Sequence, residues 1–295
     1  MEQSAHPDRS SAELPESRRK LRRFRFPVLF VTLFVVMLAV VGIDTLVAPL
    51  PLLALPVGLG LAAAGVLCYR RMSQYVEVRD NVLEVAPRGR WAGLGKGVLL
   101  GFGLFSALLL IIGVFGGWDG LSYGSFFGAL GLVGMMASVA TMEEVLFRGV
   151  LFRILEERVG TVIALVVSSL LFGLTHLVNV NATLWGALSI GLTGGAMLAS
   201  AYVLTRSLWF PIGLHFAWNF THAGLFGIAV SGSDDVPNGL LHLALDGPAV
   251  LTGGTFGPEA SLMALLVCSV ATALMLRQAA RTARIRPRPR KSSVD

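Results

Sequence analysis

Apolar runs long enough to cross a lipid bilayer constrain the fold of this chain more than any other feature of its sequence. Eight such runs lie at about 26–47, 50–68, 97–115, 125–147, 161–178, 183–204, 208–230 and 260–276. Runs of about 18 or more mostly apolar residues are typical of transmembrane helices. Because 54% of the residues are hydrophobic and only 14% are charged, the composition differs greatly from that of soluble chains. We expect an all-α polytopic membrane protein with about eight transmembrane helices.

The positive charges predict how these helices are oriented. All 24 Lys and Arg residues lie in residues 1–25, 70–96 and 148–158, at Arg206, or after residue 276. The alternate connections, at about 117–124, 178–183 and 231–259, contain no Lys or Arg. Lys and Arg accumulate in cytoplasmic loops, so we expect a multi-pass protein of the cell membrane with both termini cytoplasmic. Since these residues flank apolar runs, we expect membrane lipids, and no nucleic acid, as partners.

The same pattern divides the chain into segments. We expect a disordered basic cytoplasmic tail at 1–25, two spans and a cytoplasmic insert at 26–96, a core at 97–230, an extracytoplasmic loop at 231–259, and a last span with a basic cytoplasmic tail at 260–295. Within the insert, residues 75–79 and 82–85 alternate between polar and apolar side chains. This alternation predicts a short β-hairpin.

Three of the apolar runs carry polar side chains. These are Glu143, Glu144 and Arg148 in one run, His176 in the next, and His215 and Asn219 in a third. An ionisable group inside a membrane span is by default a functional-site hypothesis. Glu144 precedes Arg148 by four residues, which is the spacing of a favourable ion pair on a helix. We therefore expect Glu144 and Arg148 to form a supporting pair and Glu143 to face another partner.

Helical geometry brings the other polar groups together. His215 and Asn219 share one helix face, and His222 lies near that face, where we favour a structural role for it. If a helical hairpin turns at Gly160, Glu143 and His176 lie level across it. However, a span that starts at residue 161 carries His176 about 22 Å from the cytoplasmic surface. Either the hairpin projects into the cytoplasm or this span is short.

A carboxylate, two imidazoles and an amide inside a membrane suit a hydrolytic site. Glu143 can act as a general base on a water, and His176 can position that water or bind a metal ion with His215. Asn219 can donate a hydrogen bond to a developing oxyanion. The same groups would also suit the proton relay of a transporter, although we find no internal repeat between the halves of the chain.

Taken together, the motifs resemble those of the CPBP family, the CAAX-prenyl-protease and bacteriocin-processing intramembrane proteases. The matching motifs are Glu143-Glu144-Val145-Leu146-Phe147-Arg148-Gly149, Phe172-x-x-x-His176 and His215-x-x-x-Asn219. The resemblance covers about residues 100–225 and makes 97–230 a catalytic core. It implies a cavity within the membrane that opens to the cytoplasm, and an endopeptidase acting on membrane-associated or prenylated-type peptides. Glu143, His176, His215 and Asn219 correspond to the catalytic positions, and Glu144 and Arg148 to the supporting pair.

Two mechanisms stay open for these residues. In the first, His176 and His215 with a carboxylate bind Zn²⁺, which lowers the pKa of a bound water, and the family is widely labelled as a metalloprotease. In the second, Glu143 and His176 activate water without a metal, while His215 and Asn219 bind the oxyanion. The chain contains no H-E-x-x-H motif and Asn is a poor zinc ligand, so the sequence slightly favours the metal-free mechanism.

Other functions remain open as well. A catalytically silent member of the family would act as a membrane scaffold or an immunity protein. The stretch Gly120-Leu121-Ser122-Tyr123-Gly124 matches the G-x-S-x-G motif of serine hydrolases. That motif requires a turn from a strand into a helix, whereas here it lies in a short outer connection. We therefore do not expect a serine protease.

Overall fold

The computed structural model describes residues 16–233 and 237–289, and most of these residues are helical. The α-helices are α1 (Glu16–Arg23), α2 (Arg25–Val47), α3 (Pro51–Glu77), α4 (Arg90–Val114), α5 (Phe126–Glu144), α6 (Arg153–Val159), α7 (Thr161–Thr175), α8 (Leu184–Ile190), α9 (Met197–Thr205), α10 (Trp209–Asn219), α11 (Ala249–Thr252) and α12 (Leu262–Arg281). The π-helical segments are η3 (Val145–Phe152), η5 (Gly191–Ala196) and η6 (Phe220–Leu225). Short 3₁₀ helices lie at η2 (Leu83–Val85), η4 (His176–Val178), η7 (Gly254–Phe256) and η8 (Pro258–Ala260).

Within the described residues, 7 helices are long and apolar enough to cross a membrane. They are Arg25–Val47, Pro51–Glu77, Arg90–Val114, Phe126–Val159, Thr161–Val178, Leu184–Thr205 and Leu262–Arg281. The remaining expected span, at 208–230, corresponds to α10 and η6, which end at Leu225 and so are shorter than expected. The chain is therefore an all-α polytopic membrane protein, in which α10 and η6 make one further, shorter passage through the bundle.

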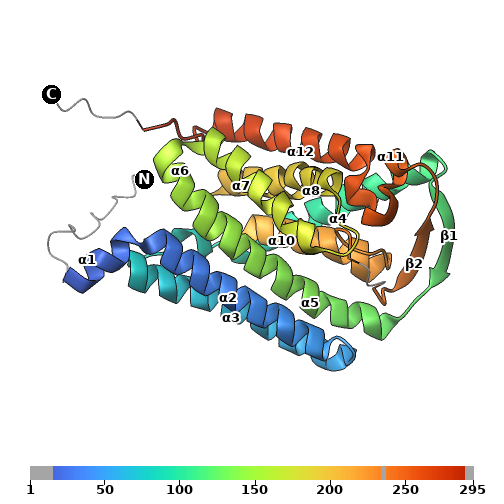
Figure 1. The fold of residues 1–295 in the computed structure, drawn as a ribbon, viewed down its shortest axis with the longest axis horizontal. Helices are drawn as coiled ribbons and strands as arrows, with labels where there is room; N and C mark the ends of the chain where they lie inside the picture. Colours follow the sequence, from blue (N-terminus) through green and yellow to red (C-terminus); the bar gives the residue numbers. More distant parts are fainter. Residues whose placement is uncertain (1–15, 234–236, 290–295) are drawn as a thin grey trace.

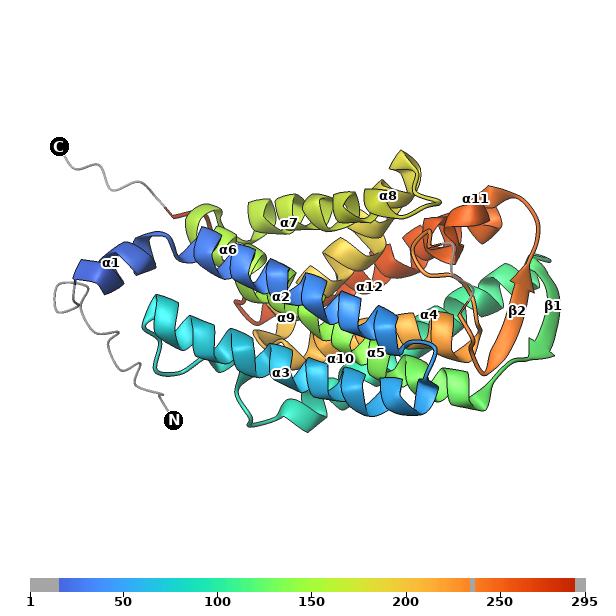
Figure 2. The same cartoon turned by 60° about the horizontal axis from the view of Figure 1, so that its bottom comes forward.

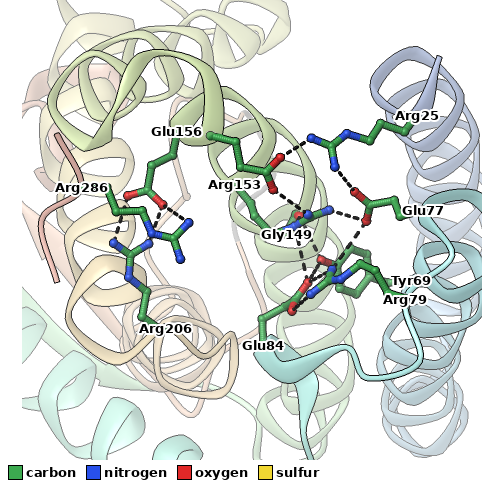
Figure 3. A network of polar contacts seen from close by, with 11 residues as sticks. Arg25, Tyr69, Glu77, Arg79, Glu84, Gly149, Arg153, Glu156, Arg206 and Arg286 are labelled. Carbon is green, nitrogen blue, oxygen red and sulfur yellow. Dashed lines mark hydrogen bonds and ion pairs between the residues drawn. The ribbon is translucent and has the colours of Figure 1, made fainter. Parts of the chain in front are cut away.

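The described ends of the chain lie at the same end of the bundle. Figures 1 and 2 show α1, α6 and the end of α12 there, and β1 and β2 at the opposite end. Backbone hydrogen bonds and ion pairs confirm this arrangement: Thr161 N donates to Arg286 O at 3.0 Å, and Arg25 pairs with Glu77 and Glu157. We call this the basic end, since Arg25, Arg79, Arg153, Arg206 and Arg286 lie there (Figure 3).

The predicted hairpin within 75–85 is wrong. Helix α3 continues to Glu77, and the chain then forms the 3₁₀ helix η2 before α4 begins. The helix continues because Val76 and Glu77 are buried in the bundle, and burial outweighs a weak local alternation. The structure instead pairs β1 (Trp118–Tyr123) with β2 (Leu241–Leu245) in an antiparallel two-stranded sheet.

The predicted disordered tail at 1–25 is also wrong where the structure describes it. Residues 16–23 form α1, in which Lys20 Nζ lies 2.9 Å from Glu16 Oε1, one helical turn away. Such pairs stabilise exposed helices modestly, and the basic last turn complements the helix dipole. Residues 1–15 lie outside the described part of the chain, so the prediction of disorder there stays a prediction.

Glycines allow the helices that carry the polar motifs to approach closely. A Cβ at Gly97 or Gly101 of α4 would overlap carbonyl oxygens of α10, and a Cβ at Gly213 of α10 would overlap the carbonyl of Leu94. Similarly, Gly195 of η5 lies against Ser169 of α7, where an added Cβ would be 2.8 Å from Ser169 Cα. Small residues permit such contacts between membrane helices. They fix the positions of α7 and α10, which both contribute to the candidate site.

Candidate active site

The first motif lies where α5 becomes π-helical. Glu143 and Glu144 end α5, and η3 follows directly. A π-helical turn interrupts the regular α-helical hydrogen bonds and often occurs at functional sites. Here the carbonyl oxygen of Gly149 accepts hydrogen bonds from Tyr69 Oη at 2.9 Å and Arg153 Nε at 2.8 Å. These bonds hold the π-helical segment that follows the two glutamates.

Tyr69 and Arg153 belong to a network of charged side chains at the basic end (Figure 3). Arg153 Nη2 lies 2.6 Å from Glu77 Oε2, and the Arg79 guanidinium donates to both carboxylate oxygens of Glu84 at 2.7 Å. The Tyr69 hydroxyl oxygen contacts Glu84 as well as the carbonyl oxygen of Gly149, and its single proton is shared between these two acceptors. Burial raises the pKa of Glu84, but the hydrogen bonds and charge of Arg79 outweigh this effect and lower the pKa below its usual value. The network therefore links the first motif to α3 and to the following turn.

Replacing Tyr69 by Phe tests this support. The variant loses both contacts of a buried hydroxyl, and we expect it to be destabilised by about 1–3 kcal/mol, measured as a lower thermal unfolding midpoint in detergent. Tyr123→Phe is a matched control, because Tyr123 is exposed on β1. Equal midpoints for the wild type and Tyr69→Phe would contradict a supporting role for this hydroxyl.

Glu144 and Arg148 form the ion pair that their spacing predicted. Arg148 Nη1 lies 2.8 Å from Glu144 Oε1, and both side chains are almost completely buried. Arg148 Nη2 also donates to the carbonyl oxygens of Gly194 and Gly195, both at 3.1 Å. The guanidinium carbon lies 4.5 Å from the centre of the Phe172 ring. Arg148 thus joins the first motif to η5 and to the helix that carries the second motif.

His215 contacts both glutamates. Its Nδ1 lies 2.9 Å from Glu144 Oε1, while its Nε2 lies 3.8 Å from Glu143 Oε2. Because an ionised carboxylate only accepts hydrogen bonds, the proton of this bond is on Nδ1 of His215. Glu144 therefore binds Arg148 and His215 with the same oxygen, a contact that the spacing within one helix does not predict. In the described residues, Glu143 Oε2 is buried without a hydrogen-bond partner.

The start of α10 explains why His215 reaches the glutamates. Leu208, just before α10, lies beside Gly149, where an added Cβ would be 3.3 Å from Leu208 Cδ1. Along their helices, Glu143 lies about 9 Å from Gly149, and His215 lies about 10 Å from Leu208. The two residues therefore meet at the same depth of the bundle.

His176 ends α7, across the hairpin from Glu143. Its Nδ1 lies 2.9 Å from the carbonyl oxygen of Phe172, so Nδ1 donates and Nε2 is left to accept or to bind. The Phe172 ring is 5.1 Å from the His176 ring and 6.0 Å from the His215 ring, centre to centre. Phe172 therefore lies close to both imidazoles and also contacts Arg148.

The hairpin turns at Gly160, whose φ of +81° suits glycine. Glu143 and His176 lie about 24 Å and 22 Å from this turn along their helices, which agrees with the predicted level placement. Both alternatives for the depth of His176 stay predictions. The fifth span, Thr161–Val178, has 18 residues, and its partner Phe126–Val159 has 34, more than is needed to cross a bilayer.

A cavity of about 550 Å³ brings the four predicted catalytic residues together. Glu143, His176, His215 and Asn219 all line it, and among the described residues the amide of Asn219 makes no hydrogen bond. Apolar side chains of α2 and α5 form much of the remaining wall. The lining extends to Ser231, away from the basic end. The expected opening toward the cytoplasm stays a prediction.

A comparison with known families matches residues 124–221 to the family model described as type II CAAX prenyl endopeptidase Rce1-like. This segment is similar to the Rce1-like family. It contains all three motifs, and the resemblance drawn from the sequence is confirmed. The Rce1-like family implies a protease-type enzyme, and with the seven apolar helices it indicates a multi-pass membrane protein. No curated protein and no solved structure gives a significant match to the chain.

The donor geometry of this Rce1-like site does not fit a metal ion. In the parts of the chain that the structure describes, no group of three or more His, Cys, Asp or Glu side chains could hold one. Nδ1 of His176 faces a carbonyl oxygen and Nδ1 of His215 faces Glu144, so each ring offers Nε2 alone. We therefore derive no step through zinc.

The G-x-S-x-G stretch is not part of the Rce1-like site. Ser122 lies within β1, opposite His242 of β2, and not at a turn from a strand into a helix. The geometry that a serine nucleophile needs is therefore not present at Ser122.

Sequence reasoning missed part of the cavity wall. Ser231 and Glu259 reach the cavity from the segment after η6, and neither lies in a recognisable motif. His222, which lies near the face of His215 in sequence, is instead buried against Phe105 with ring centres 4.6 Å apart. Neither contact could be read from helical spacing, because the first depends on how the outer segment folds back and the second on how η6 packs against α4.

Proposed function

We propose that this chain is an intramembrane endopeptidase of the cell membrane that hydrolyses membrane-associated peptides with water activated at Glu143. The observation that carries the proposal is the buried Oε2 of Glu143, which has no hydrogen-bond partner among the described residues and lies in a cavity shared with His176, His215 and Asn219. The similarity of residues 124–221 to the Rce1-like family supports a protease. The alternative of a catalytically silent scaffold has no such observation in its favour.

The proposed reaction starts with a water held between Glu143 and Nε2 of His176. Glu143 accepts a proton from the water as its oxygen attacks the carbonyl carbon of the peptide bond. When the carbon–nitrogen bond breaks, Glu143 returns the proton to the leaving amine. The apolar wall of the cavity limits bulk water, which strengthens each electrostatic contact with the reacting groups.

His215 and Asn219 are placed to stabilise the oxyanion. Nδ1 of His215 is held by Glu144, which leaves Nε2 as the ring nitrogen that faces the reacting groups. Arg148 balances the charge of Glu144. The Asn219 amide supplies a donor. Fixed donors aimed at developing negative charge are a large source of rate enhancement.

The distribution of basic side chains supports an orientation. The structure gathers Arg residues from five parts of the chain at the basic end (Figure 3), and positive residues mark the cytoplasmic side of membrane proteins. We therefore place the basic end, with both described chain ends, in the cytoplasm. Membrane lipids and a peptide or protein substrate are the partners in this proposal.

Cleavage of a membrane-associated peptide library by purified protein in liposomes tests the function. Mass spectrometry should detect products with the wild type, and few or none with Glu143→Ala or His215→Ala. Equal product formation by all three proteins would contradict the assignment of the site. Absence of cleavage by the wild type across the library would favour the scaffold alternative.

A further inference from the structure

A second carboxylate lines the cavity, and it lies outside the segment that matches the Rce1-like family. Glu259, in η8, is buried and lines the cavity with Trp218 and Ser231. Its Oε1 accepts a hydrogen bond from Trp218 Nε1 at 2.7 Å. Its Oε2 accepts from the backbone nitrogen of Ser231 at 2.9 Å and from Ser231 Oγ at 2.7 Å. Three donors therefore hold the carboxylate in one orientation.

None of these donors carries a charge. Among the described residues, His222 is the ionisable group at ion-pair distance from Glu259, with its Nδ1 3.9 Å from Oε2. No Lys or Arg of the described chain pairs with Glu259. Glu259 therefore presents an acidic side chain to the cavity without a Lys or Arg partner from the described chain.

The lining of the whole cavity also contains more carboxylates than Lys and Arg side chains. Its lining contains the carboxylates of Glu143 and Glu259, the imidazoles of His176 and His215, and no Lys or Arg side chain. Because Arg148 is paired with Glu144, it does not offset the charge of either lining carboxylate. A concave, low-dielectric site with charge of one sign attracts ligands of the opposite sign.

We propose that Glu259 binds a cationic group of the substrate, the ammonium of a lysine or the guanidinium of an arginine near the scissile bond. Trp218, which donates to Glu259, directly precedes Asn219 on α10. A peptide held at Asn219 and Glu143 therefore passes close to Glu259. The same charge disfavours an acidic side chain or a free carboxylate at this position. This inference names the substrate class of the proposed protease and rests on that function.

The test starts from a peptide that the protein cleaves. In a set of peptide variants, the four residues on either side of the scissile bond are replaced one at a time by Lys, Gln or Glu. With the wild type, we expect one position at which Lys raises kcat/KM over Gln by about tenfold, as an ion pair in a partly desolvated site would, and at which Glu lowers it. In Glu259→Gln, the Lys-to-Gln ratio should fall toward one. The ratio does not depend on how much folded protein each preparation contains.

Ser231→Ala is the matched control, because it removes a hydrogen bond to Glu259 but keeps the charge. It should retain the Lys preference. The inference is overturned if Lys and Gln peptides are cleaved equally at every position, or if Glu259→Gln keeps the wild-type ratio. If Ser231→Ala loses the preference as fully as Glu259→Gln, the carboxylate anchors the outer segment and does not select the substrate.

Binding separates this inference from the proposed function. Fluorescent Lys and Gln peptides can be titrated into wild-type protein and Glu259→Gln in detergent whether or not either protein cleaves them. Tighter binding of the Lys peptide by the wild type alone supports Glu259 as a cation site even if proteolysis fails. If the wild type is active but binds both peptides with equal dissociation constants, the cation site is contradicted and the proposed protease function is not.

Discussion

Glu143→Gln is expected to lower kcat for peptide cleavage by about 10²–10⁴-fold, the contribution of a positioned general base. The amide is close to the carboxylate in shape but cannot accept the proton of water. Because Oε2 of Glu143 has no hydrogen-bond partner in the described structure, the substitution breaks no hydrogen bond there. We therefore expect the thermal unfolding midpoint in detergent to stay near that of the wild type. Initial rates with one peptide measure the loss.

Glu144→Gln distinguishes the two neighbouring carboxylates. Glu144 is fully buried and binds both Arg148 and His215, so its amide variant should lower the unfolding midpoint as well as the rate. The opposite pattern would be a stable but inactive Glu144→Gln protein and an active Glu143→Gln protein. It would contradict the supporting role of Glu144 and the catalytic role of Glu143. Glu144 would then be the group that activates water.

Arg148→Met is expected to cause the largest loss of stability. It leaves the buried Glu144 without its cationic partner and frees the carbonyl oxygens of Gly194 and Gly195. Removal of one member of a buried ion pair costs about 3–5 kcal/mol. Thermal or denaturant unfolding in detergent measures the effect.

The double variant Glu144→Gln/Arg148→Met provides the control for this change. It removes both charges, so no buried charge is left unpaired, and it should be more stable than Arg148→Met alone. A double-mutant cycle gives the coupling between the two residues. If the single variant is as stable as the wild type, the pair does not hold the first motif in place.

Local patterns in the sequence predicted those parts of the structure that depend on a single helix. Apolar runs identified the membrane helices, and the four-residue spacing identified the pair of Glu144 and Arg148. The turn at Gly160 placed Glu143 level with His176. These features follow from helical periodicity, which the sequence carries directly.

The features that sequence reasoning missed depend on contacts between distant segments. The strands at 118–123 and 241–245 pair across more than a hundred residues, and neither shows a strong pattern alone. The alternation at 75–85 suggested strands, but burial of the end of α3 decides for a helix there. The bond between Glu144 and His215 and the reach of Glu259 into the cavity likewise depend on packing. Local propensity gives way to tertiary contacts at such places.

Metal content and activity measured on one preparation test the central claim most directly. In the proposed mechanism, Glu143 and His176 activate water without zinc. Purified protein treated with a strong chelator and desalted should then retain full peptide cleavage while elemental analysis finds far less than one metal ion per chain. Loss of cleavage on removal of the metal, with recovery on addition of Zn²⁺ alone, would contradict it.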